Sequence, residues 1–311
     1  MGYPMNSGPL KTCFLACAVA LLLLAAWPLR PALAQAEGED VSTQPLDEDG
    51  PAVSLAPTEA QQLLERALPE AGPARFELLE RQYGAAVQLA QRGRALEIAR
   101  QLAEVAAMRG LQAQEWVVIY LNAEYVWGRS GAALDACEAY LADGRLSPLT
   151  RASVALRQTY FTVARNDRAI LARIWSRADG LVAQLRQSGQ LPAALQVDWL
   201  QSRAEVERMG GELAASTATL REALGVARAD QAAARNERGL QAEHRLRETA
   251  GRVDGSQGML VYALVRQNRP QEAIEIAQGN IALWRAGRMS DGVGARWNYR
   301  LATSLNATQQ F

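Results

Sequence analysis

A short polar turn followed by a small residue recurs along this chain of 311 residues, and this recurrence limits the fold more than any other feature. The turn contains Gly, Asn or Pro, as in 126–139 and 267–278. A small residue soon after a turn lets a helix pack closely on the one before it. In this register lie Ala95, Ala133, Ala169, Ala215 and Ala273, at spacings of 38, 36, 46 and 58 residues. The pattern predicts stacked antiparallel helix pairs, with an additional helix around 230–250 in the last gap.

Composition supports an all-α fold. Ala, Leu, Arg, Gln and Glu dominate, aromatic residues are 6% of the chain, and alternating runs of Val, Ile and Thr are almost absent. Start and stop signals divide 58–311 into roughly a dozen helices of about 12 to 20 residues. Thr58 with Gln61 is typical of a capping box, and Ser147 before Pro148 is typical of a helix start. Asp254 is a candidate cap, and Gly251 is expected to lie between helices.

The N-terminal region differs from the rest. Residues 1–34 contain an apolar run at 13–27 and end in Ala32-Leu33-Ala34, a pattern typical of a secretory signal peptide cut after Ala34. We therefore expect a periplasmic or secreted protein, with no membrane insertion of the mature chain. The alternative is an uncleaved N-terminal membrane anchor.

An acidic stretch follows the signal. We expect 35–57 to be a disordered linker, because it is rich in Asp, Glu and Pro and has no basic residue. From residue 61 onward there are 31 basic and 26 acidic residues, a mildly basic surface without the concentrated charge that nucleic acid binding needs. Nucleic acid is therefore not an expected partner.

The residues available for catalysis are few. After cleavage Cys137 is the single cysteine, His244 is the single histidine, and zinc would need more such ligands. Cys137 has the spacing of a buried helix position, and His244 lies in a charged run typical of a solvated helix face. No Gly-Lys-Ser/Thr follows the glycines of 251–258, so a phosphate loop is not indicated. We expect no cofactor, no metal and no catalysis; a compact helical enzyme centred on Cys137 and His244 is the alternative.

The chain resembles the tetratricopeptide repeat family over about 75–311. The resemblance rests on the small residue early in the second helix, on Gly128-Arg129 and Asn268-Arg269 in the turns, and on large apolar residues in the first helix (Trp116, Tyr120, Leu260, Leu264). The spacing after Ala169 departs from the family. Residues 262–311 are also similar to the repeat arrays that precede the caspase-like CHAT peptidase domain in bacterial proteins. The resemblance implies an α-solenoid of stacked antiparallel helix pairs over 58–311.

The family also implies a concave groove, lined by the first helix of each pair. Counting back from the small residues gives the groove candidates Asn122, Tyr125, Gln158, Glu207, Arg208, Tyr262 and Arg266. Such side chains could clamp an extended peptide backbone and a carboxylate. An ordinary solvated helix face is the alternative.

These expectations favour a non-catalytic scaffold that binds a protein or peptide. The alternative is the recognition region of a larger protein, whose C-terminal domain is a caspase-like CHAT peptidase or an outer-membrane export barrel. The alignment puts the end of 305–311 in the turn of a pair, which would leave a helix face uncovered. We expect either an incomplete chain or a homodimer through this uncapped C-terminal end. The sequence identifies neither the partner nor the biological process.

Overall fold

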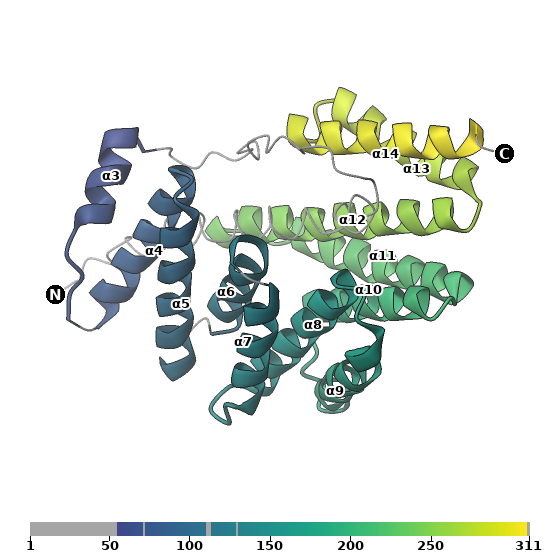
Figure 1. Cartoon of the computed structure of the whole chain (residues 1–311). Helices are drawn as coiled ribbons and strands as arrows, with labels where there is room; N and C mark the ends of the chain where they lie inside the picture. The colour runs from purple at the N-terminus through teal and green to yellow at the C-terminus, as the bar shows by residue number, and fades with distance from the viewer. Residues whose placement is uncertain (1–54, 71, 110–112, 129, 310–311) are drawn as a thin grey trace. The chain divides into compact units, whose positions relative to one another are not determined.

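A computed structural model describes residues 55–70, 72–109, 113–128 and 130–309 (Figure 1). In this part of the chain it contains twelve helices and no strand, which confirms the all-α class. The predicted signal peptide and residues 35–54 of the predicted linker lie outside the described residues. The last linker residue, Pro57, begins the first described helix.

The helices vary in length more than the sequence indicated, from 9 to 27 residues. The first five are α3 (Pro57–Glu65), α4 (Pro73–Gln88), α5 (Arg92–Arg109), α6 (Ala113–Trp127) and α7 (Ser130–Ala142). The others are α8 (Pro148–Ala164), α9 (Arg168–Gln187), α10 (Ala193–Met209), α11 (Leu213–Arg235), α12 (Leu240–Arg266), α13 (Pro270–Arg285) and α14 (Asp291–Gln309).

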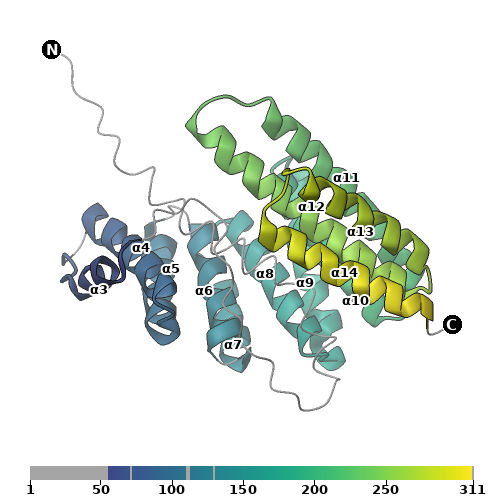
Figure 2. The ribbon, with the colours of Figure 1, turned by 90° about the horizontal axis from the view of Figure 1, so that it is seen from above.

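The described residues form two compact units, divided between Phe161 and Thr162 within α8. In unit 1, which ends at Phe161, each of the helices α3 to α7 packs on the next. In unit 2, which begins at Thr162, the same holds from α9 to α14 with α12 also contacting α10 and α14. Helices α12, α13 and α14 lie side by side there (Figures 1 and 2).

Each unit has its own apolar core. In unit 1, Trp116 of α6 is 1% exposed and meets the rings of Phe76 and Tyr83 of α4 edge-on, at centroid distances of 6.3 and 5.4 Å. In unit 2, Leu260 and Leu264 of α12 pack in one cluster with Trp297 of α14. Aromatic and leucine side chains thus fill the space between helices, where burial of apolar surface stabilises the packing.

The turns inside the helix pairs repeat one geometry. Four left-handed residues follow a first helix, with φ between 53° and 88°: Ala90, Asn166, Gly211 and Asn268. The next residue donates its backbone N–H to the carbonyl five residues back, in the bonds Gln91–Ala86, Asp167–Thr162, Glu212–Glu207 and Arg269–Leu264 (2.8 to 3.1 Å). This is the Schellman arrangement, which satisfies carbonyls that the end of a helix leaves free. The second helix therefore leaves each of these turns in a similar way.

The predicted register of small residues is right for Ala95, Ala133 and Ala273, which are fully buried. It is wrong for Ala169, which is exposed, and for Ala215, which is half-buried. The fourth residue of each second helix is the equivalent position, and all five are at most 6% exposed: Ala95, Ala133, Leu171, Ser216 and Ala273. Because leucine and serine occupy this position in two of the pairs, a pattern of alanines alone gives the wrong register there.

Other helix-start predictions had mixed outcomes. Ser147 caps α8, because its Oγ accepts the N–H of Thr150 at 3.1 Å. The Thr58–Gln61 capping box is wrong, since α3 begins at Pro57 and the side chain of Glu59 accepts the N–H of Ala56.

The expected extra helix around 230–250 is also wrong. The long helices α11 and α12 fill that gap, so Gly251 and Asp254 lie inside α12. Neither residue marks a turn or caps a helix.

Candidate protein-binding surface

The groove candidates of unit 1 are mostly inaccessible. Asn122 of α6 is 6% exposed and Gln158 of α8 is 2% exposed, and Gln158 Nε2 donates to Glu138 Oε1 at 2.7 Å. Tyr125 is half-buried and its ring stacks on Phe161, with centroids 4.4 Å apart and planes 5° from parallel. Of these three candidates, only Tyr125 offers appreciable surface to a partner.

Glu207 of α10 is bound by its neighbours in unit 2. It forms an ion pair with Arg203 at 2.8 Å and accepts the hydroxyl of Thr219 of α11 at 2.8 Å. The bond from Thr219 holds the carboxylate toward α11, so Glu207 stabilises the α10–α11 packing.

The remaining three candidates lie on two first helices that contact each other, α10 and α12. Arg208 of α10 forms an ion pair with Glu205 at 2.7 Å, and both side chains are 17% exposed. On α12 the guanidinium of the exposed Arg266 lies 4.9 Å from the ring centre of Tyr262, in cation–π geometry. We call these four residues, Glu205, Arg208, Tyr262 and Arg266, the α10–α12 patch.

The observed register of the repeat identifies surface residues that the sequence pattern did not predict. Eleven residues before the buried fourth position lie Asn122, Tyr160, Glu205 and Tyr262. Tyr160 and Glu205 were missed because the alignment at Ala169 and Ala215 was shifted by two residues and by one. Tyr160 lies beside Tyr125, with ring centroids 6.0 Å apart, and Glu205 belongs to the patch.

The α10–α12 patch has a defined electrostatic character. Burial alone would lower the pKa of Arg208, but the charge and hydrogen bond of Glu205 outweigh burial and raise it. A charge interaction with Tyr262 of α12 contributes to the same rise in the pKa of Arg208. Two arginines against one glutamate leave one net positive charge beside an aromatic ring. This combination suits a carboxylate or the carbonyl groups of a peptide backbone.

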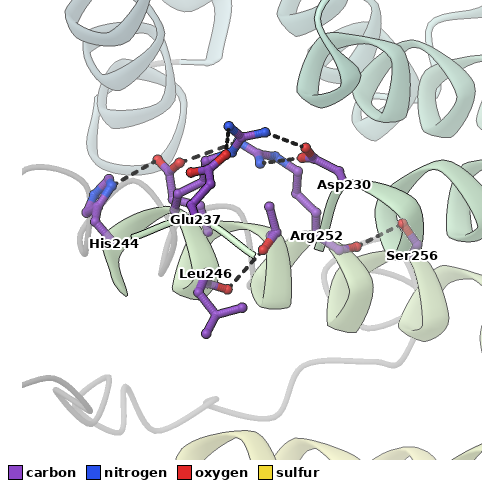
Figure 3. Close-up of polar contacts among 9 residues, drawn as sticks. Asp230, Glu237, His244, Leu246, Arg252 and Ser256 are labelled. Carbon is purple, nitrogen blue, oxygen red and sulfur yellow. Dashed lines mark hydrogen bonds and ion pairs between the residues drawn. The ribbon is translucent and has the colours of Figure 1, made fainter. Parts of the chain in front are cut away.

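A chain of ion pairs lies at the opposite end of α12 and joins it to α11 (Figure 3). Asp230 of α11 is central: its side chain is 8% exposed and pairs with Arg245 at 3.1 Å and with Arg252 at 3.5 Å. Arg245 also pairs with Glu237 in the turn between the helices. Because Asp230 is bound from two sides, these contacts lock the α11–α12 hairpin.

His244 lies at the end of this chain. Its Nδ1 is 4.0 Å from Glu248 Oε1, and Glu248 is 3.9 Å from Arg252. The side chain of His244 is 26% exposed. His244 is therefore half-buried and lies near Glu248 of its own helix, whereas a solvated helix face was expected.

Cys137 offers no activated nucleophile in this arrangement. It is fully buried on α7 of unit 1, and burial raises the pKa of its thiol, so the thiolate is disfavoured. The described residues also contain no group of three His, Cys, Asp or Glu side chains that could hold a metal ion.

Unit 1 contains one buried acid that titrates near neutrality. The pKa of Glu80 is raised to about 7: burial is the main cause and the charges of Glu115 and Glu77 add to it, while a hydrogen bond from Trp116 Nε1 at 3.2 Å acts in the opposite direction. The fully buried hydroxyl of Tyr83 has no hydrogen-bond partner among the described residues. Glu80 thus links α4 to α6 by a contact whose charge state changes near pH 7.

Comparison with models of known protein families gave no match, and comparison with curated proteins gave none either. The resemblance to tetratricopeptide repeats therefore rests on the residue pattern. Among the described helices, none has the length and apolar character needed to cross a membrane.

Proposed function

We propose that the protein is an exported, non-catalytic scaffold of tetratricopeptide-like helix pairs that binds a peptide or a segment of a partner protein. The α10–α12 patch is the proposed binding surface. The observation that carries the proposal is the exposed Arg266 over Tyr262 on α12, together with the Arg208–Glu205 pair on α10, a first helix that α12 contacts.

The repeated turn geometry supports a solenoid. Four pairs share the left-handed turn residue and the buried fourth position of the second helix, so each pair can present its first helix in a similar way. Neighbouring first helices then offer side chains to successive residues of an extended ligand.

The side chains of the patch suggest the chemistry of the ligand. Arg266 and Arg208 would bind a carboxylate, from an acidic side chain or a chain terminus, and Tyr262 would pack against an adjacent apolar or aromatic side chain. Recognition of backbone and carboxylate groups demands little of the ligand sequence, so we expect a class of related peptides instead of a single one.

Selection from a displayed library of random peptides with free C-termini tests this proposal. Peptides selected by the wild-type chain should bind the Arg266→Gln and Arg208→Gln variants about tenfold more weakly, because each change removes a charged hydrogen-bond donor. The matched control is Arg173→Gln, since Arg173 is exposed on α9, outside the patch. Failure to select any peptide, or equal binding by all variants, would contradict the proposal.

A further inference from the structure

The last two helices carry all the large apolar side chains that are exposed in the described part of the chain. These are Leu283 of α13 and Tyr299 and Leu305 of α14, which are 38%, 50% and 42% exposed. Concentration of such side chains on one helix pair is typical of an interaction surface.

Contacts with α12 and α13 fix which face of α14 is turned outward. Trp297, Arg300 and Ser304 are buried, and Trp297 and Arg300 contact Asp254 of α12. Gly294 is buried against Trp284 of α13, where a Cβ would collide with the indole ring. The opposite face of α14 is therefore exposed.

No charged side chain lies on this exposed face between residues 295 and 308. Its exposed residues are Ala295, Asn298, Tyr299, Ala302, Thr303, Leu305, Asn306 and Thr308. Ala295, Asn298, Ala302 and Leu305 follow the three-and-four spacing of a helix–helix seam. Two of these four are alanines, which allow a second helix to approach closely.

We propose that this face, the α14 face, binds the same face of a second copy of the chain. In a twofold contact the same face meets itself, and side chains near the axis face their own copies, so a charged residue there would meet a like charge. The α14 face avoids that repulsion. Its polar side chains (Asn298, Tyr299, Thr303, Asn306) each donate and accept hydrogen bonds, so they can pair with one another across the contact.

The dimer contact and the peptide-binding patch use different residues. The α10–α12 patch has no member on α14, so a dimer would present two such patches. Two linked sites raise the apparent affinity for a multivalent partner. The two proposals can fail independently.

Sedimentation velocity of the purified chain tests the dimer. We expect twice the monomer mass at tens of micromolar, and the monomer mass for Ala302→Arg, which places two like charges at the centre of the contact. The control Ala172→Arg makes the same change at an exposed alanine of α9 and should leave the dimer intact. Circular dichroism at the same concentration checks that both variants keep the wild-type helical content.

Cross-linking gives a second readout that does not depend on disruption. Under mild oxidation Ala302→Cys should form a disulfide between two copies, whereas Ala172→Cys should not, and the native Cys137 is buried. A wild-type monomer, or a dimer that Ala302→Arg leaves intact and Ala302→Cys fails to cross-link, would overturn the proposal. The α14 face would then bind a different protein or residues that follow in a longer chain.

Discussion

Asp254 accepts a hydrogen bond from Trp297 Nε1 at 2.6 Å, and this contact joins α12 to α14. The same carboxylate lies 3.5 Å from Arg300 Nη1, and the Arg300 guanidinium lies 4.3 Å from the ring centre of Trp297. Arg300 is 6% exposed, and burial lowers its pKa although Asp254 opposes this effect. A buried arginine thus depends on one carboxylate and one indole ring.

Replacement of Asp254 should therefore strongly destabilise unit 2. In Asp254→Asn the amide oxygen can still accept from Trp297, but the buried charge of Arg300 loses its counter-ion, at a cost of about 3 kcal/mol. Urea unfolding followed by tryptophan fluorescence measures this change. The control is Asp291→Asn at the exposed Trp284–Asp291 hydrogen bond, with a loss below about 0.5 kcal/mol. Equal effects at both sites would contradict this role of Asp254.

Alanine substitutions at two glycines of α12 should change stability in opposite directions. A Cβ at Gly258 would collide with the guanidinium of Arg300, which cannot withdraw without breaking its contact with Asp254, so we expect a loss of about 1 to 3 kcal/mol. Gly255→Ala meets no atom within 4 Å and should stabilise the helix by up to about 1 kcal/mol. Thermal unfolding of both variants measures whether each substitution raises or lowers stability. A stabilising effect of Gly258→Ala would contradict the close contact with Arg300.

Replacement of an alanine by glycine at a left-handed turn position should increase stability. Ala90 has φ of 53°, which costs an L-residue roughly 1 kcal/mol, so Ala90→Gly should stabilise unit 1 by somewhat less than this amount. The same substitution in a helix interior, Ala172→Gly, should destabilise by about 1 kcal/mol. Denaturant midpoints for the two variants would have to shift in opposite directions.

The stability of unit 1 should fall between about pH 4.5 and pH 7. Glu80 has a pKa of about 7 in the folded chain against 4.5 ordinarily, so the folded state holds the extra proton in this window. Stability is greatest below the unfolded pKa and decreases as pH rises through the folded pKa, by about 3 kcal/mol in total.

Glu80→Gln should remove this dependence, because the amide keeps an acceptor for Trp116 and does not titrate. The difference between wild type and variant, measured by urea unfolding at a series of pH values, isolates Glu80 from the other acids. Glu70→Gln, at an exposed position, should retain the wild-type slope. If Glu80→Gln retains that slope too, the titrating group is not Glu80.

The sequence predicted the helical class and much of the repeat, for physical reasons that particular residues make clear. Turn residues such as Asn268 and the cap Ser147 act locally, so their pattern can be recognised without tertiary contacts. Gly251 was misassigned because it lies within α12, although glycine often marks a turn, and Asp254 was misassigned because its role depends on distant residues. Glycine and aspartate usually mark turns, but Gly258 makes room for Arg300 and Asp254 binds it across 46 residues of chain.

The candidate surface was predicted only in part, because the register of the repeat was right for some helix pairs and wrong for others. Tyr262 and Arg266 were found because Ala273 fixed the register of their helix pair. Glu205 and Tyr160 were missed because Ser216 and Leu171 occupy the position where alanine was sought. Gln158 is buried and bonded to Glu138 twenty residues away, a tertiary contact that helical periodicity does not reveal.

Photo-cross-linking in the native host tests the proposed binding role most directly. A photoreactive aromatic residue in place of Tyr262 should give a covalent adduct with a partner protein or peptide, and the added change Arg266→Gln should reduce that adduct strongly. The same photoreactive residue at Ala172 should not give it. No adduct at position 262, or the same adduct at both positions, would contradict a binding surface on the first helices of unit 2.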